Sequence, residues 1–74
     1  MKFKMANVEL IKKRIKEAIK TSGYSQTKLA EKLSVSPSCV AHYVKGDIMP
    51  SITTFADLCS LLDLDPADLL GLED

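Results

Sequence analysis

The stretch Gln26–Lys45 constrains the fold of this chain more than any other, because it predicts two short helices joined by a tight turn. In each half, apolar residues recur three and four positions apart, which places them on one face of a helix. These residues are Leu29, Ala30 and Leu33 in the first half and Val40, Tyr43 and Val44 in the second. Ser25 is the expected cap of the first helix. Ser36-Pro37 predicts the second start, because serine can cap free N–H groups and proline has none to leave unpaired. Gly46 then ends the second helix.

The outward face of the second predicted helix is short, polar and free of acids. Its residues are Ser36, Pro37, Ser38, Ala41, His42 and Lys45. Val35 is the lone apolar residue of the turn, and we expect it to fill the gap between the two helices. An isolated histidine is more often a surface residue without a role, but its place on this face favours one for His42. The face is therefore suited to contact with a partner.

The net charge of zero hides a strong asymmetry along the chain. All ten Lys and Arg residues lie at or before Lys45, against four acids in the first fifty positions, which leaves this part at +6. From Ser51 onward there are six acids and no base, which gives −6. One half is suited to a polyanion and the other repels one, although a solubilising charge pattern without a partner explains the same numbers equally well.

Three further helices are predicted around this pair. Their ranges are 7 or 8 to 21, 51 to 62 and 65 to 71, with Asn7, Ser51 and Asp65 as the expected N-terminal caps. No stretch predicts a strand, and a chain of 74 residues suffices for one small core. We therefore expect an all-α, compact five-helix domain over residues 7–74, preceded by a flexible basic lead-in over residues 1–6.

Apolar stripes predict what these helices bury. The stripe of the first helix is Val8, Ile11, Ile15, Ala18 and Ile19, and that of the fourth is Ile52, Phe55, Ala56, Leu58, Cys59 and Leu62. Ile48 and Met49, in the link before the fourth helix, are expected to fold back on the core. The basic face of the first helix, which includes Arg14, is expected to be mainly solvated, although lysines on it can also approach a phosphate backbone.

The sequence contains no constellation for catalysis or metal binding. One His and two Cys form no ligand set, the acids Asp57, Asp63 and Asp68 are explained as a solvated face, and there is no glycine-rich phosphate loop. We therefore expect no enzymatic activity, no metal or other cofactor and no small-molecule substrate. No apolar run approaches the ~20 residues that span a membrane. Cys39 and Cys59 are expected to be free thiols in a reducing cytoplasm.

One pattern of residues runs through nearly the whole chain: Ser25, Gln26, Leu29, Ala30, Leu33, Val35, Ser36, Val40, Gly46, Pro50, Ser51, Leu58, Leu62, Leu64, Asp68, Leu69 and Leu70. With this spacing the chain resembles the lambda-repressor-like helix-turn-helix domain, of the lambda-repressor/Cro type also called the XRE family. The chain departs from the family at three positions. Ser34 stands where the turn often has glycine, and Val44 stands where an acid is common. Pro37 stands where the family commonly has a long polar residue that contacts bases. A left-handed backbone at Ser34 would cost of order 1 kcal/mol.

The resemblance implies a DNA-binding site on the two central helices. In this family the second helix of the pair enters the major groove with its N-terminus first, while the first helix crosses the backbone. Base contacts then fall on Ser36, Pro37, Ser38, Ala41 and His42. Ser38 and His42 are the main expected readers, whereas Pro37 and Ala41 offer apolar contact to a thymine methyl. Phosphate contacts fall on Gln26, Lys28, Lys45 and Gly46.

The resemblance also implies a homodimer, because one domain of this size contacts too few base pairs for useful specificity. The expected interface is the apolar surface at the C-terminal end: Leu61, Leu64, Leu69, Leu70 and Leu72. Alternatively, these leucines close the core of the monomer. The main hypothesis is a sequence-specific transcriptional regulator, most often a repressor, that binds a palindromic operator on double-stranded DNA. Two others stay open: an antitoxin-like or anti-repressor-like interaction module that uses its acidic C-terminal third, and the DNA-binding piece of a longer regulator.

Overall fold

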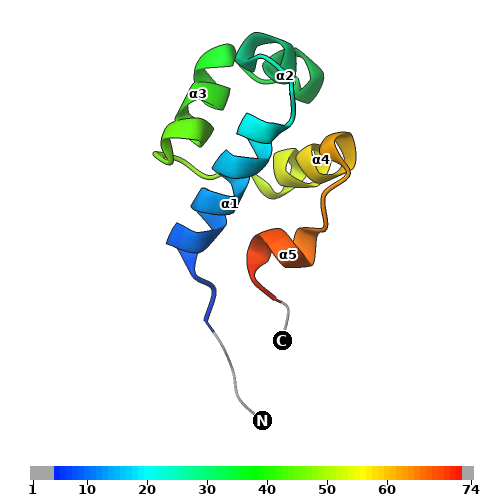
Figure 1. Cartoon of the computed structure of the whole chain (residues 1–74). Helices are drawn as coiled ribbons and strands as arrows, with labels where there is room; N and C mark the ends of the chain where they lie inside the picture. The colour runs from blue at the N-terminus through cyan, green and yellow to red at the C-terminus, as the bar shows by residue number, and fades with distance from the viewer. Residues whose placement is uncertain (1–4, 73–74) are drawn as a thin grey trace.

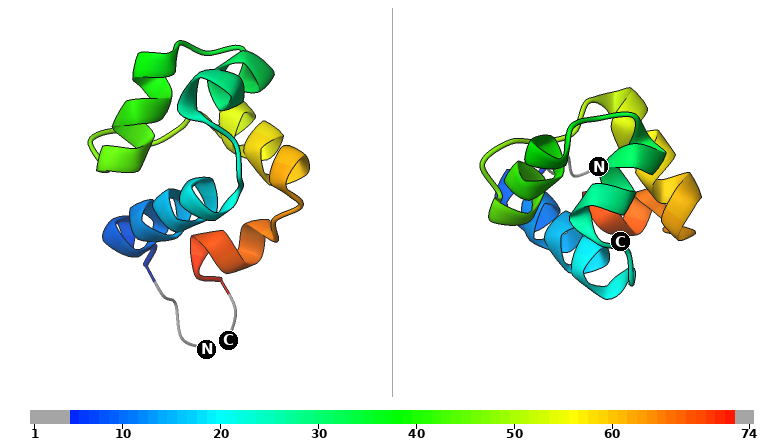
Figure 2. Two further views of the ribbon diagram at one scale, coloured as in Figure 1. Left: turned by 45° about the horizontal axis from the view of Figure 1, so that its top comes forward. Right: turned by 90° about the horizontal axis from the view of Figure 1, so that it is seen from above.

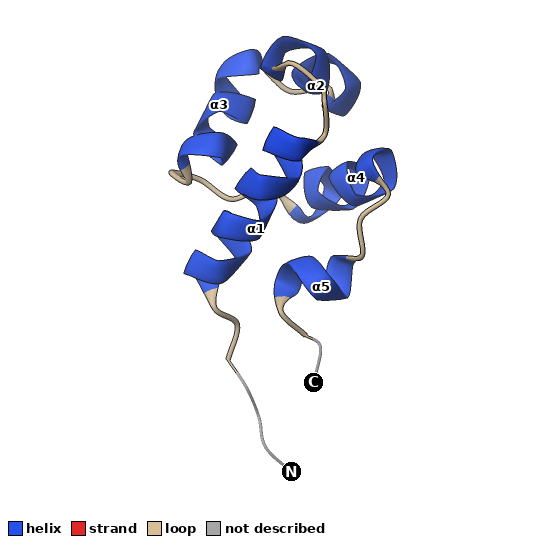
Figure 3. Cartoon of the chain, viewed as in Figure 1, coloured by secondary structure: helices blue, strands red, loops and turns tan. Residues whose placement is uncertain are grey.

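The computed structural model describes residues 5–72, and within them the chain forms five helices and no strand (Figure 3). The helices are α1 (Val8–Thr21), α2 (Gln26–Leu33), α3 (Pro37–Lys45), α4 (Ile52–Leu62) and α5 (Pro66–Leu70). These bounds confirm the predicted all-α architecture. Most of the predicted basic lead-in, residues 1–4, and the last two positions, 73–74, lie outside the described residues.

The five helices surround one core, and α1 runs through the middle of the arrangement. In Figures 1 and 2, α2 and α3 lie together at one end of the molecule, and α1 extends from α3 toward α5. α4 packs against α2, so it covers the side of the core away from α3. The helix-turn-helix pair thus packs against α1 through α3 and against α4 through α2.

The core is built from the predicted apolar positions of the first four helices. Its buried members are Ile11, Ile15, Ile19, Leu29, Ala30, Leu33, Val40, Tyr43 and Leu58. Leu29, Val40 and Leu58 are fully excluded from solvent. Burying one such side chain stabilises the fold by about 1.5–3 kcal/mol. Val35 packs against this cluster from the turn, as predicted.

Each helix begins at a side-chain cap, and the predicted caps are confirmed. The side chains of Asn7, Ser25, Ser36, Ser51 and Asp65 each accept a hydrogen bond from a backbone N–H two or three residues further on. Ser34 ends α2 with a φ of 58°, so the turn does take a left-handed residue at the position where the family often has glycine. That conformation costs a non-glycine residue of order 1 kcal/mol.

Several apolar side chains that the sequence predicts to be inward are exposed. Ile52 is 87% exposed, Val8 48%, Ile48 43% and Met49 39%. On α4 the inward positions are Phe55, Leu58, Cys59 and Leu62, spaced three and four apart, and Ile52 and the exposed Ala56 lie toward one edge of that stripe. Ile48 and Met49 belong to a connection that runs over the surface, where its backbone polar groups remain solvated.

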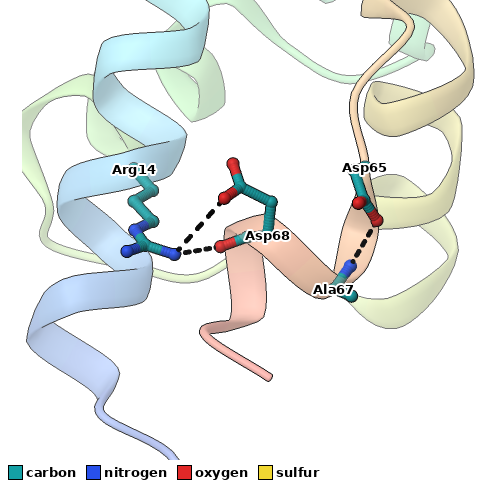
Figure 4. A network of polar contacts seen from close by, with 4 residues as sticks. All are labelled: Arg14, Asp65, Ala67 and Asp68. Atoms are coloured by element: carbon teal, nitrogen blue, oxygen red, sulfur yellow. Dashed lines mark hydrogen bonds and ion pairs between the residues drawn. The ribbon is translucent and has the colours of Figure 1, made fainter. Parts of the chain in front are cut away.

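At the C-terminal end, one residue of the predicted interface is buried and one residue of the basic face of α1 is paired. Leu69 is only 4% exposed, so it is not available to a partner and instead fills the monomer's own interior. Arg14, expected on a solvated face, donates a hydrogen bond to the backbone carbonyl of Asp68 and lies 3.8 Å from its carboxylate (Figure 4). Both placements arise because the short α5 folds back onto α1, which buries Leu69 and brings Asp68 to Arg14. In the same helix the Asp65 carboxylate caps Ala67 at 3.0 Å (Figure 4).

Candidate nucleic-acid interface

The N-terminal end of α3 is exposed and carries a side-chain cap. The Ser36 hydroxyl accepts a hydrogen bond from the Cys39 N–H at 3.1 Å, and Pro37 occupies the first turn. Ser36, Pro37 and Ser38 are all exposed. Because serine satisfies one N–H group and proline lacks another, this helix end can face a partner without leaving those groups unpaired.

The opposite face of α3 fixes the orientation of the helix. Val40 and Tyr43 are buried, and Cys39 and Val44 pack partly against the same cluster. Burial, together with a hydrogen bond to Cys39, raises the pKa of Tyr43 to about 12, so the phenol stays neutral. These inward side chains leave the helix little freedom to rotate, and the predicted base-contact residues therefore share the outward face.

The predicted phosphate contacts of α2 lie at its N-terminus. Gln26 and Lys28 are exposed, and the Ser25 hydroxyl accepts a hydrogen bond from the Lys28 N–H at 3.1 Å. The Lys28 ammonium lies 3.3 Å from Glu31, one turn further along the helix. An exposed helix N-terminus carries partial positive charge, which favours a bound phosphate. The pair with Glu31 offsets part of the charge that Lys28 brings.

The C-terminal end of α3 contains an interaction that the sequence did not predict. Gly46 is left-handed, with a φ of 83°, and its N–H bonds the His42 carbonyl at 2.9 Å. The next N–H, that of Asp47, also bonds the His42 carbonyl, at 3.1 Å. This cap returns the chain toward the helix, so the Asp47 carboxylate lies 3.0 Å from Nδ1 of His42 and 3.6 Å from the Lys45 ammonium. An acid directly after a helix-ending glycine is the sequence signal that would have predicted it.

Asp47 changes the electrostatics of the predicted readout. The hydrogen bond from His42 and, to a lesser degree, the charge of Lys45 lower the pKa of the Asp47 carboxyl below its usual 3.8. The carboxylate therefore stays ionised and opposes the positive charge at this end of α3. With Nδ1 of His42 directed at Asp47, Nε2 is the ring nitrogen that remains for a base edge.

Comparison with known proteins identifies the family. A family model described as helix-turn-helix matches residues 15–69, which covers α2, α3, α4, the second half of α1 and most of α5. The chain belongs to the XRE-type helix-turn-helix family. Its α2 and α3 are accordingly the helix-turn-helix of a DNA-binding domain of the transcriptional-regulator class.

One relative supports the family assignment, and one solved structure shares the fold. The chain is 34% identical over 64 residues to an uncharacterised HTH-type transcriptional regulator, YgzD, of Bacillus subtilis (strain 168), covering 86% of this chain and 97% of that protein. It also resembles the solution structure of the SOS-response transcriptional repressor LexA from Eubacterium rectale, with a TM-score of 0.76. That match has 22% identity and covers 90% of this chain and 69% of the other, so it bears on the fold alone.

The predicted site residues of this XRE-type domain lie in two groups, one on α3 and one on α2. Pro37, Ser38, Ala41 and His42 lie on α3 after its cap Ser36, and Lys45 and Gly46 close that helix. Gln26 and Lys28 lie separately, on the first turn of α2, which packs against α3. Within residues 5–72, no helix is both long and apolar enough to cross a membrane. The roles of the individual residues remain predictions.

Proposed function

We propose that this chain is a sequence-specific transcriptional regulator that binds a palindromic operator as a dimer and acts as a repressor. The observation that supports the proposal most directly is the exposed, acid-free N-terminal half of α3, held outward by the buried Val40 and Tyr43. A helix fits the major groove of B-DNA, where each base pair presents a distinct pattern of donors and acceptors. Repression then follows if the occupied operator blocks access of the polymerase.

The proposed readout combines few hydrogen bonds with close approach. Ser38 and His42 can donate to or accept from base edges, and Pro37 and Ala41 can contact a thymine methyl. Gln26, Lys28, Lys45 and the backbone of Gly46 would hold the flanking phosphates and set the register of α3. The short side chains at 36–38 allow the helix start to lie deep in the groove.

The proposed dimer uses a smaller apolar surface than the sequence predicts. Leu69 is buried, and Leu61 and Leu70 pack partly against the core. Leu72 remains 64% exposed and Leu64 is half-buried, so these two are the residues of the proposed interface that a partner can reach. Dimeric helix-turn-helix proteins place their two recognition helices ~34 Å apart on successive major grooves, and the proposed dimer requires the same spacing.

The test is selection of duplexes from a random pool by the full chain, followed by binding at several salt concentrations. We expect a site with two inverted half-sites, and an affinity that falls steeply between about 50 and 200 mM salt because phosphate contacts release counterions. A scrambled duplex of equal length is the control for specificity. The proposal would be contradicted if selected and scrambled duplexes bound equally, or if the affinity did not change with salt concentration. Either result would favour an interaction module that uses the acidic surface after Ser51.

A further inference from the structure

Beside the end of α3 lies a hollow with a basic lining that the helix-turn-helix pair does not explain. It is formed between the N-terminal half of α1 and the last residues of α3. Its lining residues are Glu9, Lys12, Lys13, Lys16, Lys45 and Gly46. On α1, Lys12 and Lys13 lie three and four positions after Glu9, and Lys16 lies four after Lys12, so one side of the helix turns toward Lys45. Two helices distant in sequence therefore contribute lysines to the same surface.

The hollow carries a positive charge that its own lining compensates only in part. Four ammonium groups line it, against the single carboxylate of Glu9. Among residues 5–72, no ion pair involves Lys12, Lys13 or Lys16. Lys12 and Lys16 are four positions apart on one helix, where like charges repel, so this arrangement works against the stability of α1. Lys45 is the exception, because it already lies 3.6 Å from Asp47.

The position of the hollow connects it to the proposed DNA contact. Lys45 and Gly46 belong both to its lining and to the predicted phosphate contacts at the end of α3. α1 packs directly against α3, so the lysines of α1 continue the positive surface beyond the helix that would enter the groove. Three of the four lysines come from a helix outside the helix-turn-helix pair.

We propose that this hollow, which we name the α1 lysine hollow and define by Lys12, Lys13, Lys16 and Lys45, binds a phosphate of the DNA backbone that flanks the groove occupied by α3. The inference rests on the proposed function, and it extends the footprint of each domain past the bases that α3 reads. Lysine suits this role, because its ammonium is a compact point charge that contacts phosphate oxygens without selecting a base. The hollow therefore adds affinity and fixes orientation, while sequence preference stays with α3.

The experiment compares two charge-matched double variants of the full chain on the selected operator. K12Q/K16Q removes two lysines from the hollow, whereas K20Q/K32Q removes two exposed lysines outside its lining. We expect K12Q/K16Q to make the slope of log affinity against log salt shallower by about 0.9 for each phosphate that the variant no longer neutralises. Specific and scrambled duplexes should weaken by the same factor, and K20Q/K32Q should change the slope much less. Glu9→Gln should act in the opposite direction and tighten binding.

A second readout excludes a merely structural effect. On an operator trimmed at both ends, so that the flanking phosphates are absent, K12Q/K16Q should bind as well as the unmodified chain. Ethylation of those phosphates on the full-length operator should weaken the unmodified chain and leave K12Q/K16Q unchanged. Equal slopes for the two double variants, or a K12Q/K16Q defect that persists on the trimmed operator, would overturn the inference while DNA binding stands. If the unmodified chain binds no duplex, the proposed function itself fails.

Discussion

α3 and α5 are built from the same local signals but differ in what lies around their C-terminal ends. Each begins with a capping side chain followed by proline, and each is closed by a left-handed glycine. Even the closing hydrogen bonds match, since Asp47 N–H bonds the His42 carbonyl at 3.1 Å and Leu72 N–H bonds the Ala67 carbonyl at 2.9 Å. Local sequence alone does not distinguish the two helices.

The difference between α3 and α5 is in what packs against them. A Cβ added to Gly46 would meet nothing within 4 Å, whereas one added to Gly71 would lie 3.4 Å from the Leu10 side chain of α1. α5 is further fixed to α1 by Arg14 and by the buried Leu69. The cap-and-proline start is exposed in both helices, so a capped helix start is not in itself a binding site. What differs is that the glycine after α5 lies against α1, whereas the glycine after α3 faces open space.

The largest effect should come from removing the core contact of α5. Leu69→Ala should lower the free energy of unfolding by about 2–5 kcal/mol, because it deletes a buried side chain and leaves a cavity. Leu72→Ala is the matched control, and at 64% exposure it should stay within about 0.5 kcal/mol of the unmodified chain. Urea unfolding followed by far-UV circular dichroism measures both. Equal, small losses of stability would mean that α5 is not part of the core.

The corresponding change on α3 should affect binding and leave the fold intact. His42→Ala should weaken binding to the operator by ~1–3 kcal/mol and relax the preference at one base pair. Affinities for the operator and its single-position variants measure the effect, with Ser60→Ala on the exposed side of α4 as the control. An unchanged base preference in the His42 variant would remove this residue from the readout.

The two caps offer a direct comparison of the helices. Ser36→Ala and Asp65→Ala should each cost about 1 kcal/mol of stability, because each leaves a helix N–H without its side-chain acceptor. The two variants should differ in their affinity for DNA. Only Ser36→Ala should weaken binding, because Ser36 lies in the proposed interface and Asp65 does not. Unfolding midpoints and operator affinities for both variants test this. If Asp65→Ala lost as much operator affinity as Ser36→Ala, the loss could not be assigned to DNA contact at the start of α3.

The smallest effect concerns the acid at the end of α3. The lowered pKa of Asp47 means that its contribution to stability is present above its usual pKa of 3.8 and is lost as the pH falls through the lowered value. An NMR titration of the Asp47 carboxyl should show a midpoint below 3.8 in the unmodified chain. His42→Ala should move that midpoint back toward the ordinary value more than Lys45→Gln does. The reverse order would assign the lowered pKa to Lys45.

The sequence predicts the helices well and the solvent exposure of individual side chains less well. All five starts follow from Asn7, Ser25, Ser36, Ser51 and Asp65, because a cap acts within about one turn of the chain. Ile52 shows the limit, since its spacing fits the stripe of α4 but its side chain is 87% exposed. An apolar pattern defines the inward side of a helix only to within the width of its stripe, and the packing neighbours determine the edges.

For the candidate site, the sequence by itself determined the composition of the outward face of α3 and the bounds of that helix. Only the tertiary structure decided that α5 packs against α1 and that Lys12 and Lys16 line the same hollow as Lys45. It also brought Arg14 to Asp68 across 54 positions and buried Leu69, for which the sequence left both a partner and the core of the monomer open. The physical reason is range: caps and turn residues act over a few neighbours, whereas burial and charge clustering depend on which distant helices pack together.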